Sequence, residues 1–176
     1  MNMVQDLAAR TLLVILVAAV VQDFMYMKIS NRLILMGILF SLAFGFMTGG
    51  LRQVLYVLVN ISFPVFVLYL FYLLGVLGAG DIKLFSIIGG FTNFKLLTGC
   101  MFYSFVAAAV IAVGKMLYNR NLRISVFKAG IFFRSILREG LVSYHREWAE
   151  RRNLMHFSVP ILIGYMVAVL HWKLYR

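Results

Sequence analysis

Charged residues are scarce in this 176-residue chain. Asp, Glu, Lys and Arg make up 13% of it, whereas hydrophobic residues make up 63%, and the mean hydropathy is +0.93. Soluble domains are roughly a quarter charged and half apolar, and a domain of this size has too little interior to bury so much apolar surface. This composition excludes a soluble enzyme, a disordered chain and a free DNA-binding module. We therefore expect an all-α polytopic membrane protein, with residues 1–176 forming a single membrane-embedded domain.

Cysteine is almost absent, since Cys100 is the only one in the sequence and it lies in an apolar run. A single cysteine excludes an intramolecular disulfide and a CxxC metal knuckle. The histidines His145, His156 and His171 fall in different segments without the spacing of metal ligands. We therefore predict neither a metal nor a cofactor, and Cys100 is expected to be chemically inert.

Long apolar runs dominate what is present. Because a spanning helix needs about 20 apolar residues, the sequence predicts about six crossings. The first apolar run has no strongly basic flank and no small-residue cleavage site after it, so we expect it to be kept as a helix. The expected segments cover residues 7–27, 33–48, 53–77, 82–91, 96–117 and 154–172.

The fourth segment is too short to cross on its own. About eleven residues span roughly 17 Å, against a hydrocarbon core of about 30 Å. It must either continue through residues 92–95 or begin inside the membrane after the bend at Gly78–Asp81. Irregular backbone at membrane depth requires surrounding protein or a water-filled cavity. The bend therefore suggests a cavity.

Basic residues outnumber acidic ones by 17 to 6, giving a net charge of +11. They lie mostly between apolar runs, so anionic lipid rather than nucleic acid is the expected partner. If residues 24–32, 78–83 and 115–153 share one side, that side holds twelve Lys and Arg and the other side holds five. The positive-inside rule then makes the first side cytoplasmic and puts both termini outside.

The basic stretch at about 115–153 has two interpretations. It resembles an amphipathic helix lying on anionic head groups, between the fifth and sixth spans, and this interpretation is favoured. The alternative is a substrate-recognition element. A basic leader peptide would be repelled by this stretch, so we expect such a substrate to reach the site from another direction.

Only six acids are present. Asp6 lies near the N-terminus, and the three glutamates at 139, 147 and 150 lie in the basic stretch, where pairing with nearby Arg is expected. Asp23 and Asp81 remain, each at the end of an apolar segment. The charge topology places both at similar depth on the cytoplasmic side.

Two carboxyl groups in a poorly solvated pocket cannot both ionise easily, so one keeps its proton. One group can then act as a general base toward water and the other as an acid toward a carbonyl. This is the chemistry of an aspartic protease. The plainer alternative is that Asp81 caps the fourth helix and Asp23 is an interfacial residue, and composition and spacing leave both open.

The segment Gly78-Ala79-Gly80-Asp81-Ile82-Lys83-Leu84 resembles the GxGD signature of membrane-embedded aspartic proteases, in the form found in type IV prepilin peptidases. Asp23, followed by Lys28-Ile29-Ser30-Asn31-Arg32-Leu33, resembles the family's first-aspartate element. The segment His156–Ile161, with its Pro160, resembles the element that opens the last helix. The resemblance covers about residues 10–172.

The resemblance implies a role for each matching position. Asp23 and Asp81 would be the catalytic pair, and Gly78 and Gly80 would give the backbone freedom to bring Asp81 to its partner. Supporting roles would fall to Lys83, Asn31 and Pro160.

The resemblance also implies a substrate and a location. The substrate would be a prepilin or pilin-like precursor, whose short basic leader is removed at the cytoplasmic face of the bacterial inner membrane. The chain resembles the short peptidases of tight-adherence (Flp-type) pili, without the zinc-binding insertion and methylase of larger members.

Two other functions are compatible with the composition. A small proton-coupled transporter could use the two acids to relay ions, and it would show substrate flux in proteoliposomes. A non-catalytic subunit of a pilus or secretion machine would tolerate Asp23→Asn.

Small residues have structural interpretations. The serines at 30, 86, 104 and 158 show no Ser/His pairing that would indicate serine chemistry. The glycines are expected to allow close helix packing. These glycines are Gly37, Gly45, Gly89, Gly90, Gly99 and Gly114.

Overall fold

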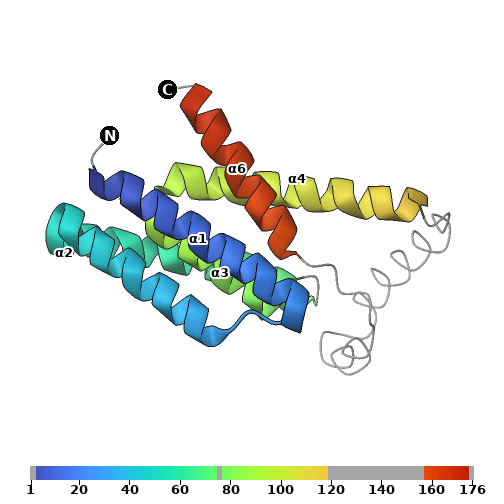
Figure 1. Ribbon diagram of the computed structural model, residues 1–176, viewed down its shortest axis with the longest axis horizontal. Helices are drawn as coiled ribbons and strands as arrows, with labels where there is room; N and C mark the ends of the chain where they lie inside the picture. The colour runs from blue at the N-terminus through green and yellow to red at the C-terminus, as the bar shows by residue number, and fades with distance from the viewer. Residues whose placement is uncertain (1–2, 75–76, 119–156, 175–176) are drawn as a thin grey trace.

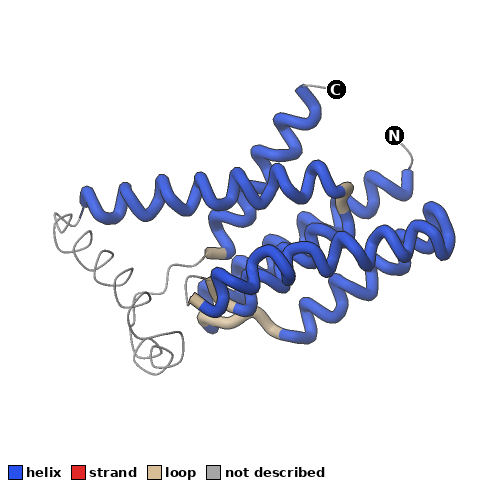
Figure 2. The backbone as a smooth tube through the Cα atoms, turned by 180° about the vertical axis from the view of Figure 1, so that it is seen from behind, coloured by secondary structure: helices blue, strands red, loops and turns tan. Residues whose placement is uncertain are grey.

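The computed structural model describes residues 3–74, 77–118 and 157–174, and the regular structure in these ranges is entirely α-helical (Figure 1). Short loops join neighbouring helices, and no strand occurs among the residues described (Figure 2). The predicted all-α class is thus confirmed for this part of the chain. The helices are α1 (Met3–Tyr26), α2 (Asn31–Leu73), α3 (Ala79–Phe91), α4 (Phe94–Tyr118) and α6 (Ser158–Leu174).

Helix α2 folds back on itself at Gly49 and Gly50, where the backbone leaves helical geometry. Residues 45 and 57 would lie about 18 Å apart along a straight helix. Instead, a Cβ placed on Gly45 would lie 3.0 Å from Cγ2 of Val57. The two limbs of α2, residues 31–48 and 51–73, therefore pack against each other (Figure 1). The break that the sequence predicts after Thr48 is confirmed.

The fold-back depends on Gly50, which has φ +61° and ψ −151°. Only glycine adopts this region readily, and other residues incur roughly 1–3 kcal/mol of strain there. Gly50→Ala should therefore lower the free energy of unfolding by about that amount, measured as a lower apparent Tm in detergent. Gly99→Ala, on a helix where a Cβ meets nothing within 4 Å, should leave Tm unchanged or raise it. Equal Tm values for Gly50→Ala and the wild type would contradict the need for glycine at the bend.

Among the residues that the structure describes, three helices are long and apolar enough to cross a membrane, and their apolar runs are Asp6–Tyr26, Asn31–Leu73 and Phe94–Lys115. Large apolar side chains on these helices face outward; Phe66, for example, is 82% exposed. Because an apolar surface of this kind is favourable in lipid and unfavourable in water, the chain is a membrane protein. Helix α6 is shorter. Six separate crossings therefore stay a prediction.

Helix α3 has 13 residues, or about 20 Å, and does not span the membrane alone. It ends at Phe91 because Thr92 is extended, with ψ 167°. Of the two alternatives for this segment, continuation as one helix through residues 92–95 does not occur, since a new helix begins at Phe94. Asn60 of α2 fastens this end by donating from Nδ2 to the Thr92 carbonyl at 3.1 Å.

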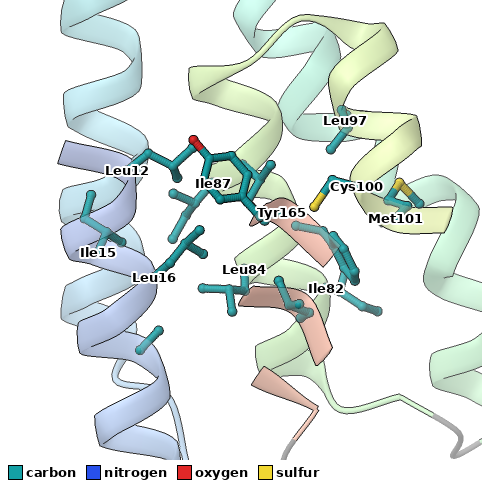
Figure 3. Close-up of a cluster of buried hydrophobic side chains, with 14 of the residues drawn as sticks. Leu12, Ile15, Leu16, Ile82, Leu84, Ile87, Leu97, Cys100, Met101 and Tyr165 are labelled. Carbon is teal, nitrogen blue, oxygen red and sulfur yellow. The ribbon is translucent and has the colours of Figure 1, made fainter. Parts of the chain in front are cut away.

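Helix α3 is the most enclosed element. Except for Lys83, its residues from Ile82 to Gly90 are all buried, which fits a helix that is apolar on every side. Figure 3 shows its side chains between those of α1, α4 and α6. Cys100 lies in this cluster as a free, buried thiol. The fully buried members include Leu12, Leu16, Leu84, Phe85, Ile87, Ile88, Leu97, Cys100 and Ile161.

Four of the predicted packing glycines do bring helices together. A Cβ on Gly37 would lie 3.0 Å from Ile87, one on Gly89 would overlap the backbone carbonyl of Asn60, and one on Gly90 would overlap Ser41. Gly45 makes the contact between the two limbs described above. The same expectation is not met at Gly99 and Gly114, because a Cβ at either position meets none of the described residues within 4 Å.

The two ends of the helix bundle differ in character. The end of α1 and the starts of α2, α3 and α6 lie toward one end, which we call the acidic end because Asp23 and Asp81 lie there. At the other end, Nζ of Lys95 lies 5.3 Å from the ring centroid of Trp172. Helix α1 begins and α6 ends toward this second end (Figure 1). The predicted amphipathic helix and the glutamates of the basic stretch at 115–153 lie outside the described residues.

Candidate active site

Asp23 lies in the last turn of α1. Its carbonyl accepts the N–H of Met27 at 2.9 Å, and Met27 ends the helix with φ +51°. The C-terminal end of a helix carries partial negative charge, which disfavours a carboxylate. An acid at this position therefore needs compensation from another part of the structure.

The compensation comes from the first residue of α6. Oγ of Ser158 donates to Oδ2 of Asp23 at 2.6 Å, and Ser158 is completely buried. Two residues on, Pro160 lies in the first turn of α6, where a missing N–H costs no helical hydrogen bond. The next residue, Ile161, closes the turn by donating to the Phe157 carbonyl at 3.1 Å.

Asp81 lies in the first turn of α3, three residues after the N-cap Gly78. Its Oδ2 accepts the N–H of Gly78 at 3.1 Å. Asp81 therefore satisfies a free donor at the helix start, but the N-cap position that the plainer interpretation gave it belongs to Gly78. The helix N-terminus also favours a negative charge electrostatically.

Burial nevertheless dominates the ionisation of Asp81, which lies on a helix too short to be one of the spanning segments. Removal from water raises the pKa of Asp81 to about 6. The Gly78 N–H acts in the lowering direction, and the charge of Asp23 raises the pKa further. The two carboxyl groups are therefore electrostatically coupled.

The two glycines near Asp81 differ in the space that a side chain would have at each position. Gly78 has φ −78°, which any residue can adopt, but a Cβ on it would lie 3.1 Å from Oδ2 of Asp81. At Gly80 a Cβ would meet Ile29 at 3.5 Å, an ordinary contact. A side chain at Gly78 would therefore crowd the carboxylate, whereas one at Gly80 would not.

Two hydrogen bonds join the segments that carry the acids. Oε1 of Gln22 accepts the N–H of Ser30 at 3.0 Å, which ties the end of α1 to the start of α2. Lys83 of α3 donates from Nζ to Oδ1 of Asn31 at 3.0 Å. The predicted site residues Asp23, Asp81, Asn31, Lys83 and Pro160 are thus brought to the acidic end.

Sequence reasoning did not identify Ser158 or Gln22 as site residues. Ser158 lies in the segment His156–Ile161 that resembles the family's last-helix element, but the sequence predicts no role for it there, and its contact with Asp23 joins positions 135 residues apart. Gln22 is adjacent to Asp23, and a polar residue next to an intramembrane acid was a usable signal.

The arrangement supplies two carboxyl groups of unlike environment, one bonded to a buried hydroxyl and one to a backbone N–H. Such a pair can move protons to and from a peptide bond and a water molecule. Among the residues that the structure describes, no three His, Cys, Asp or Glu side chains are grouped as a metal site would require.

Comparison with known proteins identifies the family. The model of the type IV leader peptidase family matches residues 11–113, which is more than half of the chain and includes both Asp23 and Asp81. No curated protein and no solved structure matches the chain. The family consists of proteases, and its match covers the end of α1 and the starts of α2 and α3 at the acidic end, but not α6. The chain belongs to the type IV leader peptidase family.

Proposed function

We propose that this protein is a membrane-embedded aspartic endopeptidase of the GxGD type, with Asp23 and Asp81 as its catalytic pair. The observation that carries the proposal is that both carboxyl groups lie at the acidic end, where Ser158 of α6 donates to Asp23 and Asp81 accepts the Gly78 N–H at the start of α3. Membership of a protease family supports the reaction class. The two carboxyl groups are sufficient for this reaction, which needs no nucleophilic side chain.

The proposed reaction begins with a water molecule held between the carboxyls and the scissile carbonyl. The Asp23 carboxylate takes a proton from the water as the water oxygen bonds to the carbonyl carbon. At the same time, protonated Asp81 gives its proton to the carbonyl oxygen. The resulting diol collapses, the C–N bond breaks, and the nitrogen takes up the proton held by Asp23. A proton returning from the diol hydroxyl restores protonated Asp81.

The proposed substrate is a prepilin or pilin-like precursor with a short basic leader before an apolar helix. Lys28, Arg32 and Lys83 lie near the two acids at the acidic end, and this supports cleavage at the cytoplasmic face of the bacterial inner membrane. The two acids supply negative charge near which a basic leader is favourably placed. We further propose the short, Flp-type form of the enzyme, which acts without the methylase.

Activity should depend on pH through Asp81. Its pKa of about 6 means that the carboxyl is protonated below that value and ionised above it. At low precursor concentration, where the rate reflects the free enzyme, leader removal should fall by about tenfold per pH unit above 6. The measurement is kcat/KM between pH 5 and 8 with the protein in vesicles, and a flat profile would contradict Asp81 as the acid.

The experiment that tests the function is co-expression with a candidate precursor, followed by gel mobility of the precursor. The expected result is a shorter product whose new N-terminus, determined by mass spectrometry, follows the leader. A precursor of unchanged size, together with solute flux in proteoliposomes containing the purified protein, would instead support a transporter.

A further inference from the structure

The hydroxyl of Ser158 makes an unusual contact, because it connects the start of α6 to the carboxylate at the end of α1. The Oγ–Oδ2 distance of 2.6 Å lies within the range of about 2.5–2.7 Å for hydroxyl bonds to ionised acceptors. Ser158 is completely buried, so water does not compete for the hydroxyl. The donor side of the bond is therefore shielded from water, whereas Asp23 is half-buried.

The dipole of α6 acts on Asp23 in the same direction as the hydroxyl of Ser158. Ser158 is the first residue of α6, and the N-terminal end of a helix carries partial positive charge. Asp23 lies at the C-terminal end of α1, which has the opposite sign. The C-terminal end of α1 disfavours a carboxylate at Asp23, and the start of α6 offsets this with a hydrogen-bond donor and a dipole of the opposite sign.

From this geometry we infer that Ser158 is a positioning residue, whose hydroxyl donates to the Asp23 carboxylate and orients it as the base of the pair, with Asp81 as the acid. The inference rests on the proposed function and adds to it the residue that orients the base. A carboxylate has about four acceptor sites on its two oxygens, and the donor at Oδ2 restricts the orientations that the group can adopt. Ser158 also lies beyond the residues matched by the family model, 11–113.

Close packing between α4 and α6 keeps the hydroxyl in place. A Cβ on Gly164 would lie 2.5 Å from the backbone N of Ser104 and 2.7 Å from its Cα. Helix α6 therefore lies directly against the backbone of α4, and its first turn cannot move away from α1 without breaking this contact. The same contact supplies a control, since Ser104 is as buried as Ser158 but its Oγ donates to the Cys100 carbonyl of its own helix at 2.7 Å.

The test uses the full chain reconstituted in vesicles and a leader-bearing precursor. Ser158→Ala should lower kcat by about 10- to 100-fold with KM unchanged, because the hydroxyl acts on the catalytic carboxylate and not on the substrate. Ser158→Thr keeps a hydroxyl and should recover most of kcat. Ser104→Ala should match the wild type in both constants, and all three should retain the wild-type Tm within a few degrees.

Three results would overturn the inference. These are a kcat for Ser158→Ala within twofold of the wild type, a loss confined to KM, or a Ser158→Thr variant of normal Tm that is as slow as Ser158→Ala. Asp23→Asn, measured in parallel, separates the two levels of the proposal. If Asp23→Asn cleaves normally, the proposed function fails; if it is inactive while Ser158→Ala is normal, only the role of Ser158 fails.

Discussion

Asp81→Asn is expected to reduce leader removal by roughly 10²- to 10⁴-fold or more, to the background of the assay. Asparagine has nearly the shape of aspartic acid but cannot give up a proton to the scissile carbonyl. Its side-chain oxygen can still accept the Gly78 N–H that Asp81 accepts at 3.1 Å, so the start of α3 should survive. The measurement is the fraction of precursor processed on co-expression, normalised to the amount of membrane-inserted enzyme.

Asp23→Asn should show a loss of similar size, because the base of the pair is then missing. Asp6→Asn is the matched control, since Asp6 is also an acid on α1 but lies in its first turn, far along the helix from Asp23. It should process the precursor at the wild-type rate. Processing at the wild-type rate in both Asp23→Asn and Asp81→Asn would contradict a catalytic role for these acids.

Gly164→Ala should have the largest effect among the structural variants. The added methyl group would be 2.5 Å from the Ser104 backbone N, and backbone cannot rotate aside as a flexible side chain can. Overpacking of this kind costs about 1–3 kcal/mol and pushes α6 away from α4. Because Ser158 begins α6, we expect both a lower apparent Tm and slower leader removal.

Gly99→Ala and Gly114→Ala provide the comparison, since both change glycine to alanine on α4 and a Cβ at either position meets nothing within 4 Å. Alanine favours a helix by about 1 kcal/mol over glycine, so neither variant should lose stability or activity. If Gly164→Ala behaved like these two, the close approach of α4 and α6 would not exist in the membrane.

The sequence predicts those features that depend on local chemistry. Paired glycines break a long apolar run, so the fold-back at Gly49 and Gly50 could be expected. Likewise, the scarcity of acids was enough to single out Asp23 and Asp81, because charge at a span end is costly and therefore informative. The fourth segment was also recognised as too short to cross, and α3 is indeed short.

Contacts between distant segments could not be predicted in the same way. The bond from Ser158 to Asp23 depends on how α6 crosses the bundle, and a single serine at a helix start carries no signal of its partner. The glycines show the same limit, because Gly89 and Gly99 look alike in sequence although only Gly89 touches a neighbouring helix. Which face of an apolar helix meets protein and which meets lipid is decided by packing, since both environments favour the same residues.

The most direct test of the account is a double-mutant cycle on the catalytic pair, measured as single-turnover cleavage of precursor by the purified chain in vesicles. The account predicts that Asp23→Asn, Asp81→Asn and the double variant all lose activity to about the same extent, because two groups that share one proton act as a unit. If the two losses multiplied in the double variant, or if either single variant cleaved at the wild-type rate, the two carboxyl groups would not form a catalytic pair.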